Sequence, residues 1–455
     1  MKMKKKVLAT GMIALALAVA NVHAKVSPEE AAKLGKTLTP IGAEKAGNAA
    51  GTIPEWTGGL KDVPASFKAG TGIYPDPFPG DAPKYTIDAS NMDKYASILT
   101  DGQKALLKKY PSFKMPVFET RRTANYPQKV YDAAKKNATS TELVEGGNGL
   151  SKFEEATPFP IPQNALEVIW NHTMRYRGGS VKRNIGQVTP MANGQYSVVK
   201  FEDQLTWLSS LTDAATVNDP NVLFYFKQVI TAPSRLAGNV LLAHETIDQV
   251  KEPRRAWVYN AGQRRVRRAP QVAYDGPGTA SDGLRTSDNF DMFNGSPDRY
   301  DWKLIGKVER LIPYNSYRLA SPDLKYDDLI KPGHINQDYT RYELHRVWHL
   351  EATLKPGTRH IYAKRVFYID EDSWGASTID QYDGRGELWR VSEAHSMHFY
   401  DQKVPWYALE SIMDLQSARY LALGLMNEEK DPYTFGLTVD SNEYTPAALR
   451  RAGKR

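Results

Sequence analysis

The sequence predicts a β-dominated α+β fold built on one large antiparallel sheet. Runs rich in β-branched and aromatic residues, joined by short turns, follow one another over about 230 residues from Gly194 onward. The chain has 25 Tyr, 14 Phe and 9 Trp, and such residues favour half-buried strand surfaces. Helical patterns at 89–109, 128–137 and 164–176 precede the strands. A sheet of this size must curl, close or split, so we expect a curved sheet whose concave side the helices fill.

The first 24 residues are predicted to be a secretory signal peptide. Four lysines within residues 2–6 precede an apolar run of 14 residues from Val7 to Ala20, with a cleavage site near Ala24. That run is too short to cross a bilayer, so we expect an exported, periplasmic protein. The chain has no Cys, which excludes disulfides and thiolate metal sites. The net charge of +7 falls to about +3 without those lysines and gives no reason to expect nucleic acid as a partner.

Residues 25–160 are expected to wrap around the sheet and to supply helices. Ser27-Pro28-Glu29-Glu30 combines a capping box with Pro at the first helical position. From Thr39 to Pro83 the chain is dense in Gly and Pro but also holds aromatic residues that are costly to leave in water. We therefore expect packing against a core, as one domain with residues 161–455, and not a flexible tether. These aromatic residues are Trp56, Phe67, Tyr74 and Phe78.

A short basic hairpin follows strands predicted at 194–201, 221–230 and 239–250. Residues 254–260 (RRAWVYN) and 263–270 (QRRVRRAP) flank an Ala-Gly turn. Two interpretations stay open. The charges either form a solvated edge that deters aggregation, or a docking patch for anionic lipid headgroups or an acidic partner. The patch comprises Arg254, Arg255, Arg264, Arg265, Arg267 and Arg268.

The clearest hairpin pattern lies at Tyr342–Asp370. Two strand-like runs flank Lys355-Pro356-Gly357-Thr358, in which Pro and Gly are typical of a tight turn. Alternate residues of each run are apolar, as on one strand face, with a single arginine in each: Arg346 and Arg365. Burying an unpaired charge costs several kcal/mol. Each arginine therefore either forms a structural ion pair or binds the polar head of an amphipathic ligand inside an apolar cavity. That cavity would be lined by Tyr342, Leu344, Arg346, Trp348, Leu350, Arg365, Phe367 and Ile369.

The remaining segments are predicted more coarsely. Residues 274–297 hold four Asp among Gly and Ser, but their spacing fits no EF-hand, so we expect an ordinary solvated loop. Strands are expected at 374–382 and 387–400. Residues 412–426 suit a hairpin or a helix, and a terminal helix follows Thr445-Pro446.

No motif supports catalysis. The sequence has no Gly-x-Ser-x-Gly elbow, Walker loop or Gly-x-Gly-x-x-Gly, and no identifiable glycosidase dyad. His345 and His349 would face one another on a helix, but on a strand they lie about 13 Å apart. We interpret them, and His395 and His398, as solvated strand residues. We predict no catalytic residue, no metal and no cofactor.

Four long motifs resemble one uncharacterised family of exported Gram-negative proteins, labelled domain of unknown function or outer-membrane lipoprotein-sorting-like. The motifs lie at 37–60, 101–118, 160–179 and 342–374. The resemblance implies a fold similar to the Lol-type lipoprotein carriers, an unclosed β-barrel whose hydrophobic cavity is lidded by helices. Residues 255–270 resemble the carriers' strand-turn-strand element. Members of the family are also thought to accompany inner-membrane efflux-type transporters.

The sequence and the resemblance together predict a non-catalytic periplasmic protein, peripheral to the outer membrane. It would bind and shuttle a hydrophobic or amphipathic molecule, such as a lipid or lipoprotein, between the two membranes. An inner-membrane transporter, an outer-membrane protein and a membrane surface are the expected partners. The alternatives are an accessory or scaffold subunit of an envelope transporter and, more weakly supported, a hydrolase of envelope lipids or glycans.

Overall fold

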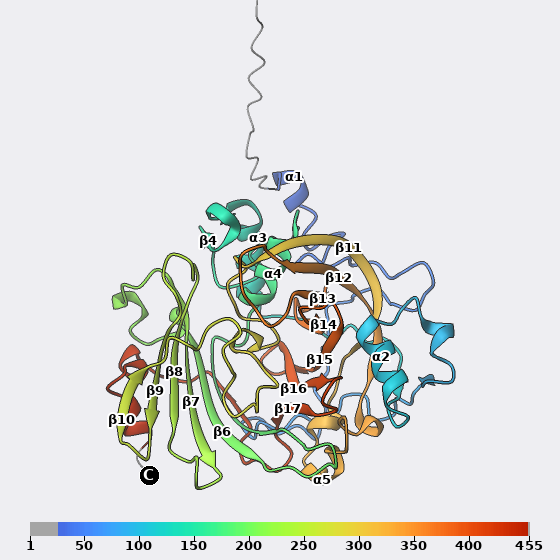
Figure 1. The fold of residues 1–455 in the computed structure, drawn as a ribbon. Helices are drawn as coiled ribbons and strands as arrows, with labels where there is room; N and C mark the ends of the chain where they lie inside the picture. Colours follow the sequence, from blue (N-terminus) through green and yellow to red (C-terminus); the bar gives the residue numbers. More distant parts are fainter. Residues whose placement is uncertain (1–25, 454–455) are drawn as a thin grey trace, which may run out of the picture.

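The computed structural model describes residues 26–453, and its main element is one curved sheet of 16 strands (Figure 1). Neighbouring strands are antiparallel, except that β2 meets β12 in parallel. The two ends of the sheet, β1 and β10, do not pair with each other among the described residues. The predicted β-dominated fold with an open barrel is therefore confirmed. The predicted signal peptide lies outside the described residues. No helix within residues 26–453 is long and apolar enough to cross a membrane.

The α-helices are short, and the chain between residues 180 and 426 is rich in strands. The helices are α1 Pro28–Ala31, α2 Asp101–Lys109, α3 Gln128–Ser140, α4 Ala165–Met174, α5 Tyr326–Leu329 and α6 Leu449–Ala452. The strands of the large sheet are β1 Tyr85–Ile87, β2 Met115–Val117, β5 Ser180–Val188, β6 Val199–Trp207, β7 Val222–Ala232, β8 Val240–Thr246, β9 Arg255–Asn260, β10 Arg265–Arg268, β11 Tyr300–Pro313, β12 Tyr342–Leu354, β13 Lys364–Asp370, β14 Ala376–Tyr382, β15 Leu388–Phe399, β16 Val404–Asp414, β17 Tyr420–Leu425 and β18 Tyr433–Phe435. A separate small ribbon pairs β3 Glu142–Leu143 with β4 Leu150–Ser151.

The order of strands in the sheet differs from their order along the chain. Strands β5 to β10 form one meander and β12 to β17 form another. The two meanders are joined where β17 pairs with β5, with Ala422 opposite Val188. Strand β18 extends this junction along β5, with Tyr433 opposite Arg183. The last strands of the chain therefore connect its two halves.

The part of the sheet formed by β12 to β17 is covered on both faces. Helix α4 lies in the concave side and shares an apolar cluster with Ile379 of β14 (Figure 1). The next residue, Asp380, points to the opposite face, where it accepts a hydrogen bond of 3.1 Å from the backbone N–H of Gly102 in α2. Helix α2, expected on the concave side, thus packs on the convex one. Because both faces are covered, every residue of β16 is buried.

Two features of the strand pattern differ from expectation. The connection between β12 and β13 runs from 355 to 363, longer than the predicted four-residue turn, and leaves Ile361 exposed. Strand β11, the longest of the sheet, was not predicted because polar residues interrupt its pattern. It pairs with β12 along its whole length.

Residues 412–426 form the hairpin of β16 and β17, one of the two structures their composition allowed.

Candidate functional site

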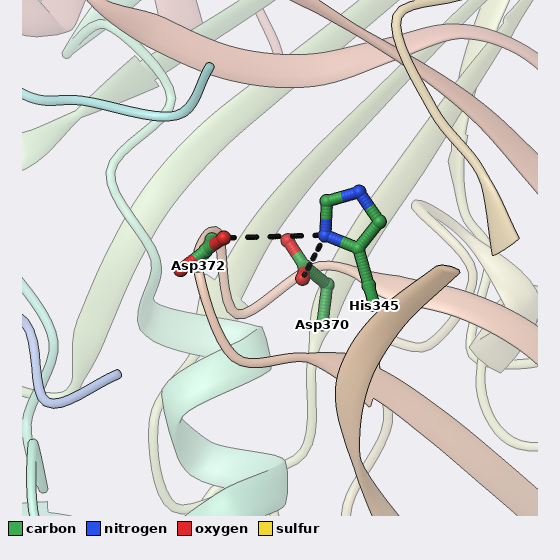
Figure 2. A group of neighbouring side chains, drawn as sticks. All are labelled: His345, Asp370 and Asp372. Atoms are coloured by element: carbon green, nitrogen blue, oxygen red, sulfur yellow. Dashed lines mark ion pairs between the residues drawn. The ribbon is translucent and has the colours of Figure 1, made fainter. Parts of the chain in front are cut away.

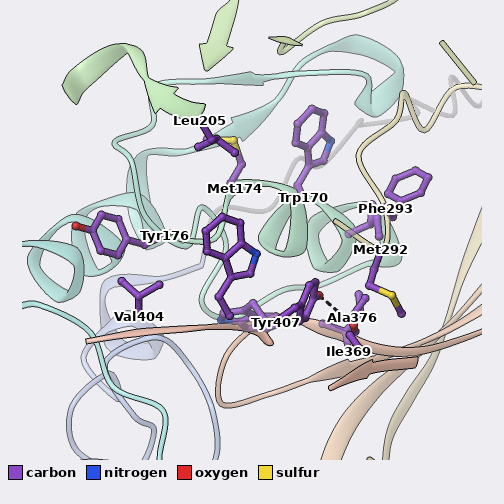
Figure 3. Close-up of a cluster of buried hydrophobic side chains, with 14 of the residues drawn as sticks. Trp170, Met174, Tyr176, Leu205, Met292, Phe293, Ile369, Ala376, Val404 and Tyr407 are labelled. Atoms are coloured by element: carbon purple, nitrogen blue, oxygen red, sulfur yellow. Dashed lines mark hydrogen bonds between the residues drawn. The ribbon is translucent and has the colours of Figure 1, made fainter. Parts of the chain in front are cut away.

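The concave side of the sheet is filled by the segment between β10 and β11, residues 269–299, which we call the inner loop. It was expected to be solvated, yet Asp288, Asp291, Met292 and Phe293 are buried. Met292 and Phe293 join the apolar cluster of α4, which also contains Ile369 of β13 (Figure 3). The expectation was wrong because the acidic residues of this loop face arginines of the barrel interior instead of water.

Two buried carboxylates hold the inner loop in place. Asp291 Oδ1 lies 2.8 Å from Arg175 Nη2 and accepts a hydrogen bond of 2.8 Å from Trp406 Nε1, while its Oδ2 pairs with Arg177. Burial alone would raise the pKa of Asp291, but the two guanidinium groups hold it well below its ordinary value. Asp288 binds Arg365 from β13. The loop is thus fastened to the residues that follow α4 and to strands β13 and β16.

The two arginines on the apolar strand faces form ion pairs. Arg346 Nε lies 2.7 Å from Glu371 Oε1, and Arg365 Nη2 lies 2.6 Å from Asp288 Oδ2. Both arginines are buried. Of the two interpretations that the sequence left open, the structure thus corresponds to the structural ion pair and not to a free arginine in a ligand cavity.

The apolar residues predicted to line a cavity are divided between two clusters. Trp348, Leu350, Phe367 and Ile369 pack with α4 and the inner loop. Tyr342 and Leu344 belong to the cluster on the side of α2. The structure therefore does not bring all eight predicted cavity residues onto one surface.

A pocket opens instead between the inner loop and strands β7 and β8. It encloses about 60 Å³ and is lined by Phe226, Leu241 and Ala243 from the sheet and by Phe290 from the loop. The guanidinium of Arg285 also lines it. Gly278 lies beside that guanidinium, where an added Cβ would approach Nε to 2.8 Å, so glycine leaves room for the arginine side chain.

Arg285 differs from the other buried arginines in having no carboxylate partner. Ten arginines are buried within residues 26–453, and nine of them lie within ion-pair distance of an Asp or Glu. In the described part of the chain Arg285 forms no such pair, and its Nε has no hydrogen-bond partner. Burial accordingly lowers its pKa. A buried cation without an ion-pair partner, at a pocket lined by both apolar and polar side chains, is the arrangement expected for the anionic group of an amphipathic ligand. We call the cavity between the inner loop and β7 and β8, together with its lining residues, the Arg285 pocket.

The predicted basic patch divides into a buried and an exposed part. Arg254 is buried against Glu245 at 2.7 Å, and Arg255 pairs with Asp219. These two arginines are therefore structural and do not belong to an exposed patch. The other four are exposed on the hairpin of β9 and β10, where β10 is the edge strand of the sheet. They are Arg264, Arg265, Arg267 and Arg268.

A polar cluster connects β12 to the turn after β13 (Figure 2). His345 Nδ1 lies 3.7 Å from Asp370 Oδ1 and 3.9 Å from Asp372 Oδ2. Burial and the charge of Asp372 raise the pKa of Asp370 to about 7. His345, His395 and His398 were predicted to be solvated but are buried, because the second face of the sheet is also covered. His349 is separate from the cluster and stacks on Tyr368.

Comparison with known proteins places the chain among its relatives. A family model described as "Protein of unknown function (DUF1329)" matches residues 86–450. The chain belongs to this family. Uncharacterized protein PA3922 of Pseudomonas aeruginosa is 62% identical over the full length of both chains. The resemblance to an uncharacterised family that the motifs indicated is thus confirmed for this DUF1329 chain.

Two solved structures show a weak likeness to the DUF1329 chain. A putative outer membrane lipoprotein-sorting protein domain from Vibrio parahaemolyticus has 14% identity and a TM-score of 0.42, covering 63% of this chain and 98% of its own. A DUF1329 family protein from Desulfovibrio piger has 13% identity and a TM-score of 0.41, covering 60% and 92%. These likenesses are too weak to transfer a function.

The residues of this DUF1329 chain that the sequence pattern did not reveal lie mostly in the inner loop. Arg285, Asp288 and Asp291 stand among Gly, Ser and Thr, a composition typical of solvated loops. One signal was present, because Leu284, Phe290, Met292 and Phe293 are too apolar for a segment lying wholly in water.

Proposed function

We propose that this DUF1329 protein is a non-catalytic, periplasmic binding protein for an anionic amphiphile. The observation that carries this proposal is Arg285, a buried arginine with no carboxylate within ion-pair distance in residues 26–453, which lines a pocket that is part apolar and part polar. A carboxylate or phosphate head group would supply the missing negative charge and would accept paired hydrogen bonds from the N–H groups of the guanidinium. The apolar part of the ligand would lie against Phe226, Leu241 and Phe290.

The size of the pocket implies that the inner loop moves when ligand binds. Sites for small molecules usually enclose about 300–1,000 Å³, whereas the Arg285 pocket encloses about 60 Å³. Loop residues 277–279 and 285–287, with Phe290, line one side of the pocket, and residues of β7 and β8 line the other. Displacing this part of the loop would extend the pocket along the concave side of the sheet. A carrier needs such a movement of the loop, because the apolar surface that ligand binding buries must be exposed again before the ligand can be released.

Replacing Arg285 by leucine is expected to abolish the preference for an anionic head group while the protein stays folded. Binding of a long-chain fatty acid should weaken about 10- to 100-fold, because a hydrogen bond to a charged group contributes roughly 1.5–3 kcal/mol. Binding of the fatty alcohol of equal chain length should hardly change. The melting temperature should equal or exceed that of the wild type, since a buried unpaired charge is removed.

The matched control for that experiment is Arg267→Leu, which removes an exposed arginine from the edge strand β10. It should leave both affinities unchanged. Native mass spectrometry of protein prepared from the periplasm provides an independent check, with a co-purifying anionic lipid expected in the wild type and in Arg267→Leu but not in Arg285→Leu. Equal fatty-acid affinity of the wild type and the Arg285→Leu variant would contradict the proposal.

The four exposed arginines are proposed to dock the loaded protein on an anionic membrane surface, as shuttling between membranes requires. Each basic residue near such a surface contributes about 1 kcal/mol at low salt. Reversing Arg264, Arg265, Arg267 and Arg268 to Glu should reduce binding to phosphatidylglycerol vesicles at least tenfold and leave phosphatidylcholine vesicles unaffected. Unchanged vesicle binding, together with cross-linking of β10 to an envelope transporter in cells, would instead favour the accessory-subunit alternative.

A further inference from the structure

We propose that His345, Asp370 and Asp372 bind a divalent metal ion of the Zn²⁺ class, independently of the Arg285 pocket. One ligand atom from each of the three side chains lies within 4.8 Å of the other two. Zn²⁺ lies about 2.0–2.2 Å from N and O ligands, so tetrahedral ligands are about 3.4 Å apart. The distances of 3.7 and 3.9 Å from His345 Nδ1 to the two carboxylates therefore need to shorten by only a few tenths of an ångström.

The imidazole of His345 is held in the orientation that a metal ligand needs. Its Nε2 lies 3.1 Å from Glu343 Oε2, which would accept the Nε2 proton. The lone pair of Nδ1 is then directed at Asp370 and Asp372, the two carboxylates that this nitrogen faces in Figure 2. Glu343 is fixed in turn by Arg341 Nε at 2.6 Å and by Asn315 Nδ2 at 2.9 Å. A carboxylate that orients a histidine in this way is the usual second partner of a metal-bound imidazole.

A second observation at the cluster points to a missing cation. Asp370 Oδ1 faces His345 Nδ1 and has no hydrogen-bond partner in the described chain, although Asp370 is only 1% exposed. The other oxygen of this carboxylate accepts a hydrogen bond of 2.6 Å from Ser373 Oγ. The hydroxyl of Tyr314, whose ring packs on His345 at 4.1 Å, is also buried without a partner. Buried polar atoms are rarely left unpartnered, so a ligand at this point is expected.

The carboxylates around the cluster are not all neutralised by arginine or lysine in the described residues, so the local charge balance allows a bound cation. Asp372 pairs with Arg122 at 2.6 Å, Glu371 pairs with Arg346, and Glu343 pairs with Arg341. Asp370 is the carboxylate of the cluster that no arginine or lysine neutralises within ion-pair distance in the described residues. The bound metal would tie the turn after β13 to β12 and, through Arg122, to the N-terminal segment.

Metal binding is tested with the full chain, purified without a histidine tag and treated with a chelator. The wild type is expected to bind one equivalent of Zn²⁺ by isothermal titration and elemental analysis, and to melt at a higher temperature with Zn²⁺ than without it. Asp370→Asn should lose this binding and this shift. Glu343→Gln should weaken binding about 10- to 100-fold, as changes to orienting partners do. The matched control is Asp323→Asn, an exposed position that should bind as the wild type does.

A spectroscopic measurement on the wild type avoids any folding defect of the variants. Co²⁺ in place of Zn²⁺ should give the visible absorption of a four-coordinate nitrogen and oxygen site, and Zn²⁺ should displace it. The proposal is overturned if the chelator-treated wild type binds neither ion above the level of the Asp370→Asn variant. In that case the cluster would be a salt bridge of a doubly protonated His345 only.

Discussion

Replacing Asp291 by alanine is expected to reduce the free energy of unfolding by about 3–5 kcal/mol, the usual cost of removing one partner from a buried ion pair. The substitution leaves Arg175 and Arg177 buried without their counter-charge and leaves the indole N–H of Trp406 without an acceptor. The inner loop should then detach and expose the apolar cluster beneath it. Denaturant unfolding measures the first effect, and binding of a hydrophobic dye under native conditions measures the second.

The inner loop provides a matched control in Asp282→Ala. Asp282 has a positive φ of 49°, close to the 53° of Asp291, so alanine meets the same backbone cost at both positions. Asp282, however, pairs with Arg419 at the surface, where an ion pair contributes about 0–1 kcal/mol. The difference between the two variants therefore isolates the buried charge. If both variants lost the same stability, the ion pairs of Asp291 would not be what holds the loop.

Replacing Glu393 by glutamine is expected to stabilise the protein by up to about 3 kcal/mol at pH 8 and to have little effect at pH 4. Glu393 lies under α2, 1% exposed, and accepts hydrogen bonds from Tyr342 Oη at 2.9 Å and Gln103 Nε2 at 3.3 Å. Burial raises its pKa from an ordinary 4.5 to about 7. The folded state therefore keeps a proton that the unfolded chain has already released, and stability falls as the pH rises from 4.5 through 7. Glutamine stays neutral and avoids this loss.

The measurement for this prediction is the free energy of unfolding at several pH values between 4 and 8. Other buried acids, such as Asp380 and Glu410, have pKa values raised to about 7 in the same way, so the wild type alone does not isolate one group. The informative quantity is the difference between the wild type and Glu393→Gln. The exposed residue Glu387 precedes the same strand, and Glu387→Gln should keep the wild-type pH dependence. The same pH dependence in Glu393→Gln would contradict the assignment.

The fold class could be predicted because its signals are local. The alternation in residues 342–354 and the Pro-Gly turn after them specify a strand and a reversal regardless of the rest of the chain. The covering of the second face could not be predicted in this way. Glu343 and His345 alternate with apolar residues, as solvated residues do, yet they are buried beside Arg341 and Asp370.

The candidate sites depend on contacts between distant residues, which a single sequence does not reveal. The two arginine partners of Asp291, Arg175 and Arg177, directly follow α4 and lie 116 and 114 residues earlier in the chain. Arg285 carries no local sign that it lacks such a partner, because its state depends on which carboxylates the folded sheet brings near it. The sequence pattern therefore indicated arginines in an apolar interior but not which of them is unpaired.

The pairing of β17 with β5 also determines when this protein can fold. An N-terminal portion of the chain ending before residue 420 can form β5 to β10, but one edge of β5 then has no neighbour. An unpaired edge of this kind is a template for aggregation. Contacts of such high sequence separation also form slowly. The chain thus keeps an unpaired sheet edge through most of its synthesis, and this edge is paired only when the last strands of the chain arrive.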